Sequence, residues 1–337
     1  MKKIAIIGAG PAGMAAACEL GRNGYEVELF EGNREPLAHV TDKEVLFPNF
    51  VPSTEIKDAF LDRLRHSGVS LRCGTYVSGV EYHSDADGSG CWRVGPVEAD
   101  AVLLASGYAV FDARKKEELG HGIYKGVVDS LAMERMLKNR SVVNGIGEFP
   151  RRVVFLQCVG SRDEKTGNNY CSKMCCMTAV KQAVRTRQIL QDAEVYVFYM
   201  DLRMWGQHFE ELYRESQEQY GVRFVRGRVS EVCGTFDGKV QLKAEDTLLG
   251  RPMKMTTDLL VLMVGMRPSE GTLQLGRSCG IGGEYGFVSV RDAVMHDNET
   301  HRDGLFVAGS CKRPMSLSEA VNDGKSAAYE IMNYLKG

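Results

Sequence analysis

Three spaced glycines follow the first apolar stretch of the chain, and they restrict its fold more than any other feature. Residues 3–7 read Lys-Ile-Ala-Ile-Ile, which predicts a buried strand, and Gly8, Gly10 and Gly13 come directly after it. A helical pattern then continues to about residue 23. In such a turn the first glycine permits a sharp bend, the second lets the backbone approach a pyrophosphate, and the third lets helix and strand pack closely. The sequence therefore predicts a dinucleotide-binding βαβ unit.

A carboxylate ends the second predicted strand. Residues 25–31 alternate in polarity, and Glu31 lies 23 residues after Gly8. A carboxylate at this place accepts ribose hydroxyls and repels a 2′-phosphate, so the pattern favours FAD or NAD and disfavours NADP. The alternative is a structural glycine turn followed by an ordinary surface glutamate.

Two later turns favour FAD over NAD. Ala105-Ser106-Gly107 follows one apolar strand, and Gly309-Ser310 follows another, before a terminal helix at about 316–335. These turns resemble the second and third FAD contacts of flavoproteins with two dinucleotide-binding domains, such as thioredoxin reductase and glutathione reductase. Many of those flavoproteins carry an acidic residue where this chain has Ser310. The residues expected to contact FAD are Gly8, Gly10, Pro11, Ala12, Gly13, Glu31, Gly32, Val77, Ala105, Ser106, Gly107, Gly309, Ser310 and Leu317.

The order of the predicted elements gives an expected domain organisation. An apolar strand at 152–158 begins a second α/β unit, and the strand and turn at 304–309 resemble the first unit again. We expect an α/β, thioredoxin reductase-like fold. Its FAD domain would be discontinuous, with residues 1–148 and 269–337, and a Rossmann-like domain would be inserted at 149–268.

Net charge, apolar run length and cysteine content indicate the cellular location of the chain and the classes of ligand that it does not attract. The chain has 42 Lys and Arg against 44 Asp and Glu, a net charge of −2, so no overall field attracts nucleic acid or an anionic membrane. No uncharged apolar run approaches roughly 18 residues, so no transmembrane segment is predicted. Ten cysteines in 337 residues are too few for a disulfide scaffold, which favours a reducing, cytoplasmic location.

Four of the ten cysteines fall within 19 residues: Cys158, Cys171, Cys175 and Cys176. They stand where the inserted domain of a nicotinamide-dependent flavoprotein would carry phosphate-binding glycines. The sequence contains no C-x-x-C, which weakens a thioredoxin reductase-like thiol relay. Adjacent Cys175 and Cys176 have Cα atoms about 3.8 Å apart, shorter than the usual disulfide range.

Metal binding is a better use for these thiols. If Cys171 begins the helix, it shares a face with Cys175 four residues later, Cys176 lies about 100° round the helix, and Cys158 returns from the strand end. Four thiolates suit a 4Fe-4S cluster or Zn. Zinc sites favour paired C-x-x-C elements, which C-x12-C-x3-C-C lacks. Inert or redox-sensing thiols are the third possibility.

Several segments resemble the flavin and cluster core of the A-type subunit of heterodisulfide reductase. They are Phe155-Leu-Gln-Cys-Val-Gly-Ser-Arg-Asp163, Tyr170-Cys-Ser-Lys-Met-Cys-Cys-Met and Tyr199-Met-Asp-Leu-Arg-Met204, with Ser106-Gly-Tyr and Gly309-Ser-Cys. The resemblance implies that Cys158, Cys171, Cys175 and Cys176 are the ligands of a flavin-proximal 4Fe-4S cluster. It also implies that Lys181 approaches the reactive flavin nitrogen, with a solvated helix lysine as the alternative.

The resemblance carries an expected function. The chain lacks the ferredoxin-like C-x-x-C-x-x-C repeats of the methanogen protein. It is therefore similar to the short subunits found in sulfur-oxidising heterodisulfide reductase-like complexes, or to the flavin subunit of the quinone-interacting complex in sulfate reducers. This implies an electron-transfer oxidoreductase with FAD and a 4Fe-4S cluster, partner subunits and a homodimeric state. The alternatives are a free-standing NAD(P)H-dependent disulfide oxidoreductase and a non-catalytic subunit stabilised by Zn or a cluster.

Overall fold

A computed structural model describes residues 1–84 and 90–337 and divides into two compact units. Unit 1 comprises 1–41, 54–109 and 267–337, and unit 2 comprises 42–53 and 110–266. The sequence at 85–90 predicts a turn, and all of it except Gly90 lies outside the described residues. The chain therefore passes from one unit to the other four times.

The unit boundaries differ from the expected ones at 148/149. Residues 110–148 belong to unit 2 because the short strand β11 (Val127–Asp129) pairs with β18 (Leu259–Val264), and because helix α4 (Ser130–Lys138) packs on that unit's core. The second boundary falls at 266/267 where 268/269 is expected. Residues 42–53 join unit 2 although the segments on both sides of them belong to unit 1.

Unit 1 is built on a parallel sheet with the strand order β5-β2-β1-β9-β20. Helix α1 (Pro11–Arg22) begins with proline in its first turn, where no intrahelical N–H is needed, and continues with small helix-forming residues. A second, antiparallel sheet contains β6, β7 and β8. The remaining bounds are β1 Lys3–Ile7, β2 Glu26–Phe30, α2 Ala38–Thr41, α3 Ser53–Arg65, β5 Ser70–Arg72, β6 Glu81–Ser84, β7 Gly90–Val94, β8 Val97–Ala99, β9 Ala101–Leu104, α7 Glu270–Ser278, β20 Leu305–Val307 and α8 Leu317–Lys336.

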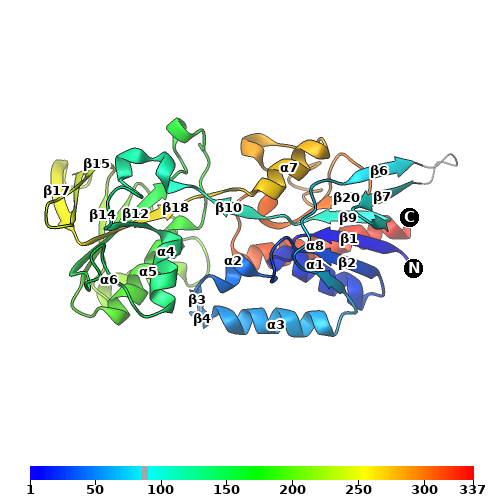
Figure 1. Cartoon of the computed structure of the whole chain (residues 1–337), viewed down its shortest axis with the longest axis horizontal. Helices are drawn as coiled ribbons and strands as arrows, with labels where there is room; N and C mark the ends of the chain where they lie inside the picture. The colour runs from blue at the N-terminus through cyan, green and yellow to red at the C-terminus, as the bar shows by residue number, and fades with distance from the viewer. Residues whose placement is uncertain (85–89) are drawn as a thin grey trace. The chain divides into compact units, whose positions relative to one another are not determined.

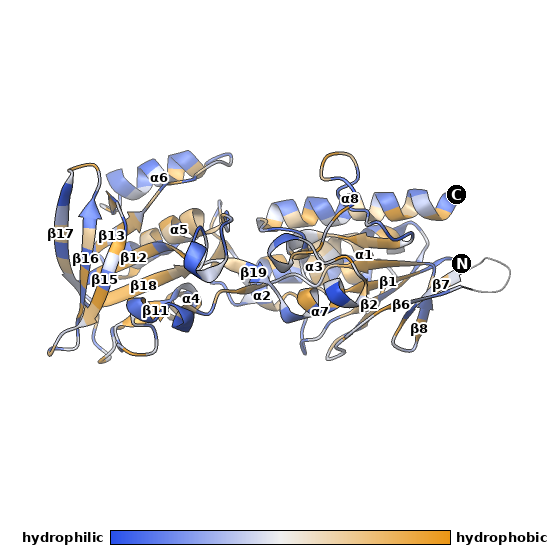
Figure 2. Cartoon of the chain, turned by 90° about the horizontal axis from the view of Figure 1, so that it is seen from above, coloured by the Kyte–Doolittle hydropathy of each residue, from blue (hydrophilic) through white to orange (hydrophobic). Residues whose placement is uncertain are grey.

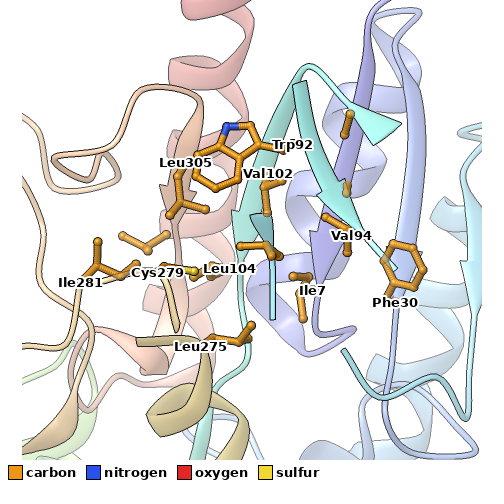
Figure 3. Packing of buried hydrophobic residues seen from close by; sticks show 14 of the residues in the cluster. Ile7, Phe30, Trp92, Val94, Val102, Leu104, Leu275, Cys279, Ile281 and Leu305 are labelled. Carbon is orange, nitrogen blue, oxygen red and sulfur yellow. The ribbon is translucent and has the colours of Figure 1, made fainter. Parts of the chain in front are cut away.

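The core of unit 1 lies between its two sheets. Alternate residues of a strand face opposite sides, so Ala5 and Ile7 of β1 face the same side and belong to the buried cluster that also contains Trp92 and Val94 of β7. Figure 3 shows Ile7, Trp92 and Val94 in this cluster. Helices α1 and α8 lie side by side (Figure 1), and a Cβ atom added at Gly324 would come within 2.1 Å of the Ala12 carbonyl oxygen. Unit 1 is thus layered as helices, parallel sheet and antiparallel sheet.

Unit 2 repeats this architecture with a different local sequence. Its parallel sheet has the order β11-β18-β12-β13-β14, and its antiparallel sheet the order β15-β16-β17. The remaining bounds are β3 Val45–Leu46, β4 Val51–Pro52, β12 Arg152–Val159, α5 Cys175–Ile189, β13 Glu194–Tyr199, α6 Phe209–Glu218, β14 Arg223–Arg226, β15 Val229–Gly234, β16 Val240–Asp246 and β17 Arg251–Thr257. The chain passes between the units in β10 (Tyr108–Val110) and β19 (Met266–Pro268), which pair with each other.

The central strands of unit 2 are apolar on both faces. Val154 and Leu156 of β12 pack toward the antiparallel sheet, while Val153 and Phe155 pack against α4 and α5. The hydropathy colouring shows apolar inner strands and more polar residues on β17 and α6 (Figure 2). This continuous burial is typical of parallel strands covered on both sides.

Neither disulfide bonds nor an apolar helix of membrane-spanning length contribute to these two units. All ten cysteines are free of disulfide bonds. Within the described part of the chain, no helix combines the length and apolarity needed to span a bilayer.

Candidate functional site

The glycine-rich turn lies where the strand order of unit 1 reverses. Counted from β1, the chain builds outward through β2 and β5 on one side and then through β9 and β20 on the other. In open α/β sheets, ligands bind outside the carboxyl ends of the strands at this switch point. The turn at 8–13 follows β1 and the turn at 105–107 follows β9, so two predicted FAD-contacting turns meet there.

Close packing requires glycine at positions 8 and 13, whereas position 10 faces open space. Gly8 has φ +110°, and a Cβ atom there would lie 2.3 Å from the Ala105 carbonyl oxygen. A Cβ atom at Gly13 would lie 1.9 Å from the Gly8 carbonyl oxygen. At Gly10, by contrast, a Cβ atom would meet no described atom within 4 Å. This open space at the amino end of α1 fits a dinucleotide pyrophosphate.

The Glu31 carboxylate stabilises the same turn by accepting hydrogen bonds. Its Oε2 accepts from the Ala9 N–H at 2.8 Å, and its Oε1 accepts from the Asn33 N–H at 2.8 Å and from Asn33 Nδ2 at 2.7 Å. A carboxylate has about four acceptor positions, so one remains for a ribose hydroxyl. Asn33 is a site residue that the glycine motif does not reveal.

The first turn of α7 holds the second FAD-contacting turn. The Ser269 hydroxyl donates to the Ser106 carbonyl oxygen at 2.9 Å, and the Thr272 hydroxyl donates to the Gly107 carbonyl oxygen at 2.8 Å. Ser269 is also the N-cap residue of α7 and accepts from the Thr272 N–H. A serine directly before a helix predicts such a cap. Its contact with residues 106–107 joins positions more than 160 residues apart in the sequence.

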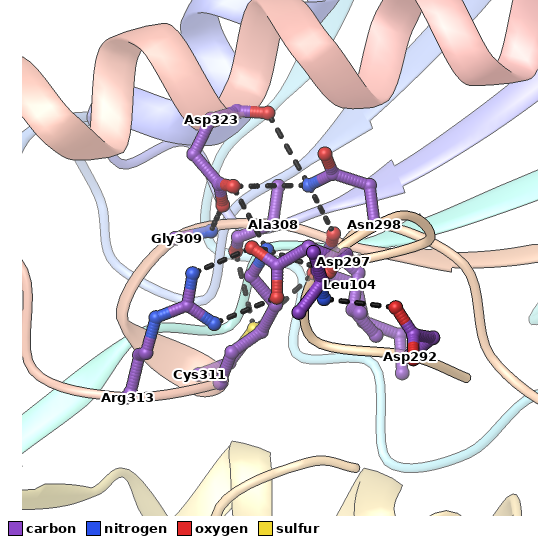
Figure 4. Close-up of polar contacts among 12 residues, drawn as sticks. Leu104, Asp292, Asp297, Asn298, Ala308, Gly309, Cys311, Arg313 and Asp323 are labelled. Atoms are coloured by element: carbon purple, nitrogen blue, oxygen red, sulfur yellow. Dashed lines mark hydrogen bonds and ion pairs between the residues drawn. The ribbon is translucent and has the colours of Figure 1, made fainter. Parts of the chain in front are cut away.

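Buried charges hold the third turn (Figure 4). The Gly309 N–H donates to Asp323 Oδ2 at 2.6 Å, and Lys312 Nζ contacts Asp323 Oδ1 at 2.8 Å and Asp297 Oδ2 at 3.0 Å. Burial would raise the pKa of Asp297, but hydrogen bonds from Arg313 and Lys312 outweigh it, so the pKa lies below its usual value. Asp323 is a further residue that the motifs miss.

The remaining expected FAD contacts also belong to unit 1. Pro11 and Ala12 open α1, Gly32 follows β2, Val77 packs against the core between the two sheets, Ser310 follows Gly309, and Leu317 is the first residue of α8. The structure therefore assigns the whole expected FAD set to one unit, whereas Lys181 and the four clustered cysteines belong to unit 2.

In unit 2 the cysteines occupy the corresponding switch point. Cys158 lies at the end of β12, whose two neighbours in the sheet are β13 and β18. The register between β12 and β18 shifts between Leu156 and Val159, and Cys158 has φ +62°. Irregularities of this kind redirect side chains and recur at functional sites. Cys175 and Cys176 open α5, which follows the loop after β12.

The expected helical position of Cys171 is wrong. Helix α5 begins at Cys175 with Met174 as its N-cap residue, so Cys171 lies in the preceding loop and does not share a helix face with Cys175. The Cys171 sulfur accepts from the Lys173 N–H at 3.3 Å, and Lys173 has φ +61°. Cys171 thus reaches the site from a tight loop.

The four thiols lie near enough to affect one another electrostatically. Burial raises the pKa of Cys158 to about 11, with repulsion from Cys176 and Cys171 contributing to this shift. Burial also raises the pKa of Cys175, with added repulsion from Cys158, Cys176 and Cys171. The Ser161 hydroxyl lies near enough to lower the pKa of Cys175, although the two side chains do not meet at hydrogen-bond geometry. Four thiolates together therefore need a positive charge among them.

The donor set of unit 2 is four cysteine thiols, the ligand type that iron-sulfur clusters take. Across residues 1–84 and 90–337, no three His, Cys, Asp or Glu side chains converge as ligands of a single ion. A cluster spreads its ligands, because each iron takes one thiolate. Two buried polar atoms beside the cysteines, Gln157 Nε2 and Ser161 Oγ, have no hydrogen-bond partner among the residues that the structure describes. The four-thiol donor set and these unpaired atoms suit an iron-sulfur group.

Lys181 is buried, so its interpretation as a solvated helix lysine is wrong. Its side chain contacts Glu134 Oε1 as an ion pair, and Nζ lies 3.2 Å from the Val45 carbonyl oxygen. Burial lowers the pKa of Lys181, and Glu134 opposes that shift. Gln182 Nε2 also donates to Glu134 Oε1, at 2.8 Å. Sequence patterns miss Glu134, which reads as one polar residue of an amphipathic helix.

Comparison with known proteins finds a matching family model and similar chains. A family model described as pyridine nucleotide-disulphide oxidoreductase matches residues 2–107. The chain is 38% identical, over 243 residues, to the A-type subunit of the H2/formate:CoB-CoM heterodisulfide,ferredoxin reductase of Methanococcus maripaludis, which covers 70% of this chain and 37% of that protein. The A-type subunit of the H2:CoB-CoM heterodisulfide,ferredoxin reductase of Methanothermobacter thermautotrophicus is 37% identical over 239 residues, covering 69% and 36%. The chain thus spans little more than a third of these relatives.

Solved structures show the same fold at low sequence identity. Lactococcus lactis thioredoxin reductase aligns with a TM-score of 0.68 at 19% identity, covering 100% of this chain and 99% of that one. The thioredoxin reductase of T. acidophilum aligns with a TM-score of 0.69 at 18% identity, covering 100% of both chains. The expected thioredoxin reductase-like α/β fold is confirmed.

Proposed function

The chain belongs, over 70% of its length, to the family of oxidoreductases formed by the A-type subunits of heterodisulfide reductase, and on that premise we propose that it transfers electrons by means of FAD and one 4Fe-4S cluster. It would act with other subunits of a heterodisulfide reductase-like complex in sulfur or thiol-disulfide metabolism, and as a homodimer. The observation that carries the proposal is the position of Cys158, Cys175 and Cys176 at the switch point of unit 2.

The chain's own residues have separate tasks in this proposal. The turn at 8–13 and the amino end of α1 would bind the pyrophosphate, and Glu31 would accept a ribose hydroxyl. Cys158, Cys171, Cys175 and Cys176 would hold the cluster. Arg162, which pairs with Asp201 at 2.7 Å, would offset part of the thiolate charge, since it already lowers the pKa of Cys158. FAD can exchange two electrons at a time, whereas a 4Fe-4S cluster exchanges one. Together they would connect a two-electron reaction partner with single-electron carriers.

Metal analysis tests the proposal directly. Protein purified without oxygen should contain about four irons and four acid-labile sulfides per chain, and should give the EPR signal of a reduced 4Fe-4S cluster. Cys175→Ala should lose most of the iron and keep its flavin, because the two groups of residues belong to different units. Cys233→Ala, on β15, is the matched control and should keep both. Stoichiometric zinc without iron would contradict the proposal.

The same preparation separates the proposed function from a disulfide reductase driven by NAD(P)H. The segment after β12 carries cysteines in place of the phosphate-binding glycines of a nicotinamide site, so neither NADH nor NADPH is expected to bleach the flavin of the purified chain under anaerobic conditions. Rapid bleaching by either nucleotide would favour the free-standing disulfide oxidoreductase.

Lys181 is proposed to tune the flavin. A cation near the flavin stabilises its reduced, anionic form, so Lys181→Met should lower the flavin midpoint potential by about 30 mV or more, which is tenfold in a two-electron equilibrium. Lys116→Met is the control, since Lys116 pairs with Asp163 and Glu118 in the same unit. An unchanged flavin potential in Lys181→Met would leave this lysine with a structural role only.

A further inference from the structure

Two side chains beside the clustered cysteines each present a buried polar atom without a partner. Gln157 is 5% exposed and Ser161 is 1% exposed, yet Gln157 Nε2 and Ser161 Oγ make no hydrogen bond with any described residue. Native proteins rarely leave such groups unpaired, since each costs free energy comparable to a lost hydrogen bond. Both atoms can donate a proton, so both need an acceptor.

Gln157 lies directly against one proposed ligand. Its Oε1 is 3.1 Å from the Cys176 sulfur, which donates to it as a thiol. As a thiolate ligand, Cys176 has no proton to donate, and an amide oxygen facing it would be repelled. A half-turn of the amide about its last bond would present Nε2–H to the sulfur instead, because the two ends of an amide have nearly the same shape.

Ser161 lies in the crowded loop between the ends of β12 and β18. A Cβ atom added at Gly265, which follows β18, would lie 2.6 Å from Ser172 Oγ and 3.2 Å from Ser161 Oγ. Ser172 Oγ accepts from the Met266 N–H at 2.8 Å, whereas Ser161 Oγ has no such contact. The Ser161 hydroxyl lies near Cys175 and has no hydrogen-bond partner among the described residues.

We propose that Gln157 Nε2 and Ser161 Oγ donate hydrogen bonds to the sulfur atoms of the cluster and thereby raise its reduction potential. This inference rests on the proposed function, because it requires the cluster. A reduced cluster carries more negative charge than an oxidised one, so hydrogen-bond donors stabilise the reduced form more. Gln157 and Ser161 are positioning residues that set the potential and are not ligands.

Replacing each donor by an apolar side chain of similar size tests the inference. In Gln157→Met and Ser161→Ala, the ratio of reduced to oxidised cluster at a fixed potential should fall about tenfold, which is a midpoint shift of about −59 mV for one electron. The measurement is an anaerobic redox titration followed by EPR. EPR reports only chains that carry the cluster, so a variant that loads poorly still gives a value.

The chain offers a matched control for each variant. The control for Gln157 is Gln241, whose Oε1 lies 3.9 Å from the sulfur of Cys233, a cysteine that is not a proposed ligand. The control for Ser161 is Ser216, a buried serine that donates to the Tyr213 carbonyl oxygen. Gln241→Met and Ser216→Ala should leave the cluster potential unchanged. In D2O, Ser161→Ala should also lose one exchangeable deuteron coupled to the cluster in the wild-type ENDOR spectrum.

The outcomes separate this inference from the proposed function. A wild-type protein without iron contradicts both. A wild-type protein with a 4Fe-4S cluster, whose potential is the same in Gln157→Met, Ser161→Ala and the two controls, overturns the inference and leaves the proposed function standing. Shifts confined to the two donor variants support it.

Discussion

Glu134→Ala is expected to lower the free energy of unfolding of unit 2 by about 3–5 kcal/mol, the range for removing one partner of a buried ion pair. The Glu134 side chain is 3% exposed and that of Lys181 is 4% exposed, so the substitution leaves a cation in the interior without its counterion. It also removes the acceptor of Gln182 Nε2 and of the Glu44 N–H, which lies 3.2 Å from Glu134 Oε2.

Urea unfolding of the whole chain, followed by a probe in unit 2, measures this effect. Glu231→Ala is the control, because Glu231 and its partner Lys243 are about half exposed, and such surface pairs contribute less than about 1 kcal/mol. The double variant Glu134→Leu with Lys181→Met removes both charges and should recover most of the lost stability. A Glu134→Ala effect as small as that of Glu231→Ala would show that the pair is not buried in solution.

Gly10→Ala is expected to weaken FAD binding about ten- to hundredfold without destabilising the flavin-free protein. Gly10 has φ −77°, which alanine adopts readily, and an added Cβ atom meets no described atom within 4 Å. The methyl group would instead enter the space assigned to the pyrophosphate, where overpacking costs about 1–3 kcal/mol. Fluorescence titration of flavin-free protein with FAD gives the dissociation constant.

Gly271→Ala provides the matched control for Gly10→Ala. Gly271 lies inside α7, where an added Cβ atom would lie no closer than 3.7 Å to its neighbours, and alanine there should be tolerated or slightly stabilising. Its FAD affinity should equal that of the wild type. If Gly10→Ala also kept wild-type affinity while remaining folded, the pyrophosphate would have to bind elsewhere.

Sequence patterns predicted the parts of this molecule that depend on neighbours along the chain. The turn at 8–13 is recognisable because the tight bend, the close approach to residue 105 and the helix start all need glycine within six residues. The same holds for the terminal helix predicted at about 316–335, whose start the structure shows capped by Ser316 and Glu319. Such features need no knowledge of the tertiary structure.

Features that depend on distant contacts were missed. The strand β11 is three residues long and becomes part of unit 2 only through pairing with β18, more than 130 residues later. Cys171 was placed on a helix because its spacing to Cys175 equals one helical turn, but the loop with positive φ at Lys173 delays the helix start. The partners Glu134 and Asp323 are ordinary polar residues until the fold buries them.

The short segment 42–53 has a consequence for how unit 2 could be made or exchanged. It supplies Glu44, which pairs with Arg185, the Val45 carbonyl oxygen beside Lys181, and Phe47, whose ring lies 4.3 Å from that of Phe209. A recombinant fragment of residues 110–266 would lack all three and expose the surface they cover. One continuous stretch of the gene therefore cannot transfer the cysteine-bearing unit to another protein. A transferred unit that folds would need residues 42–53 and 110–266 joined by a linker.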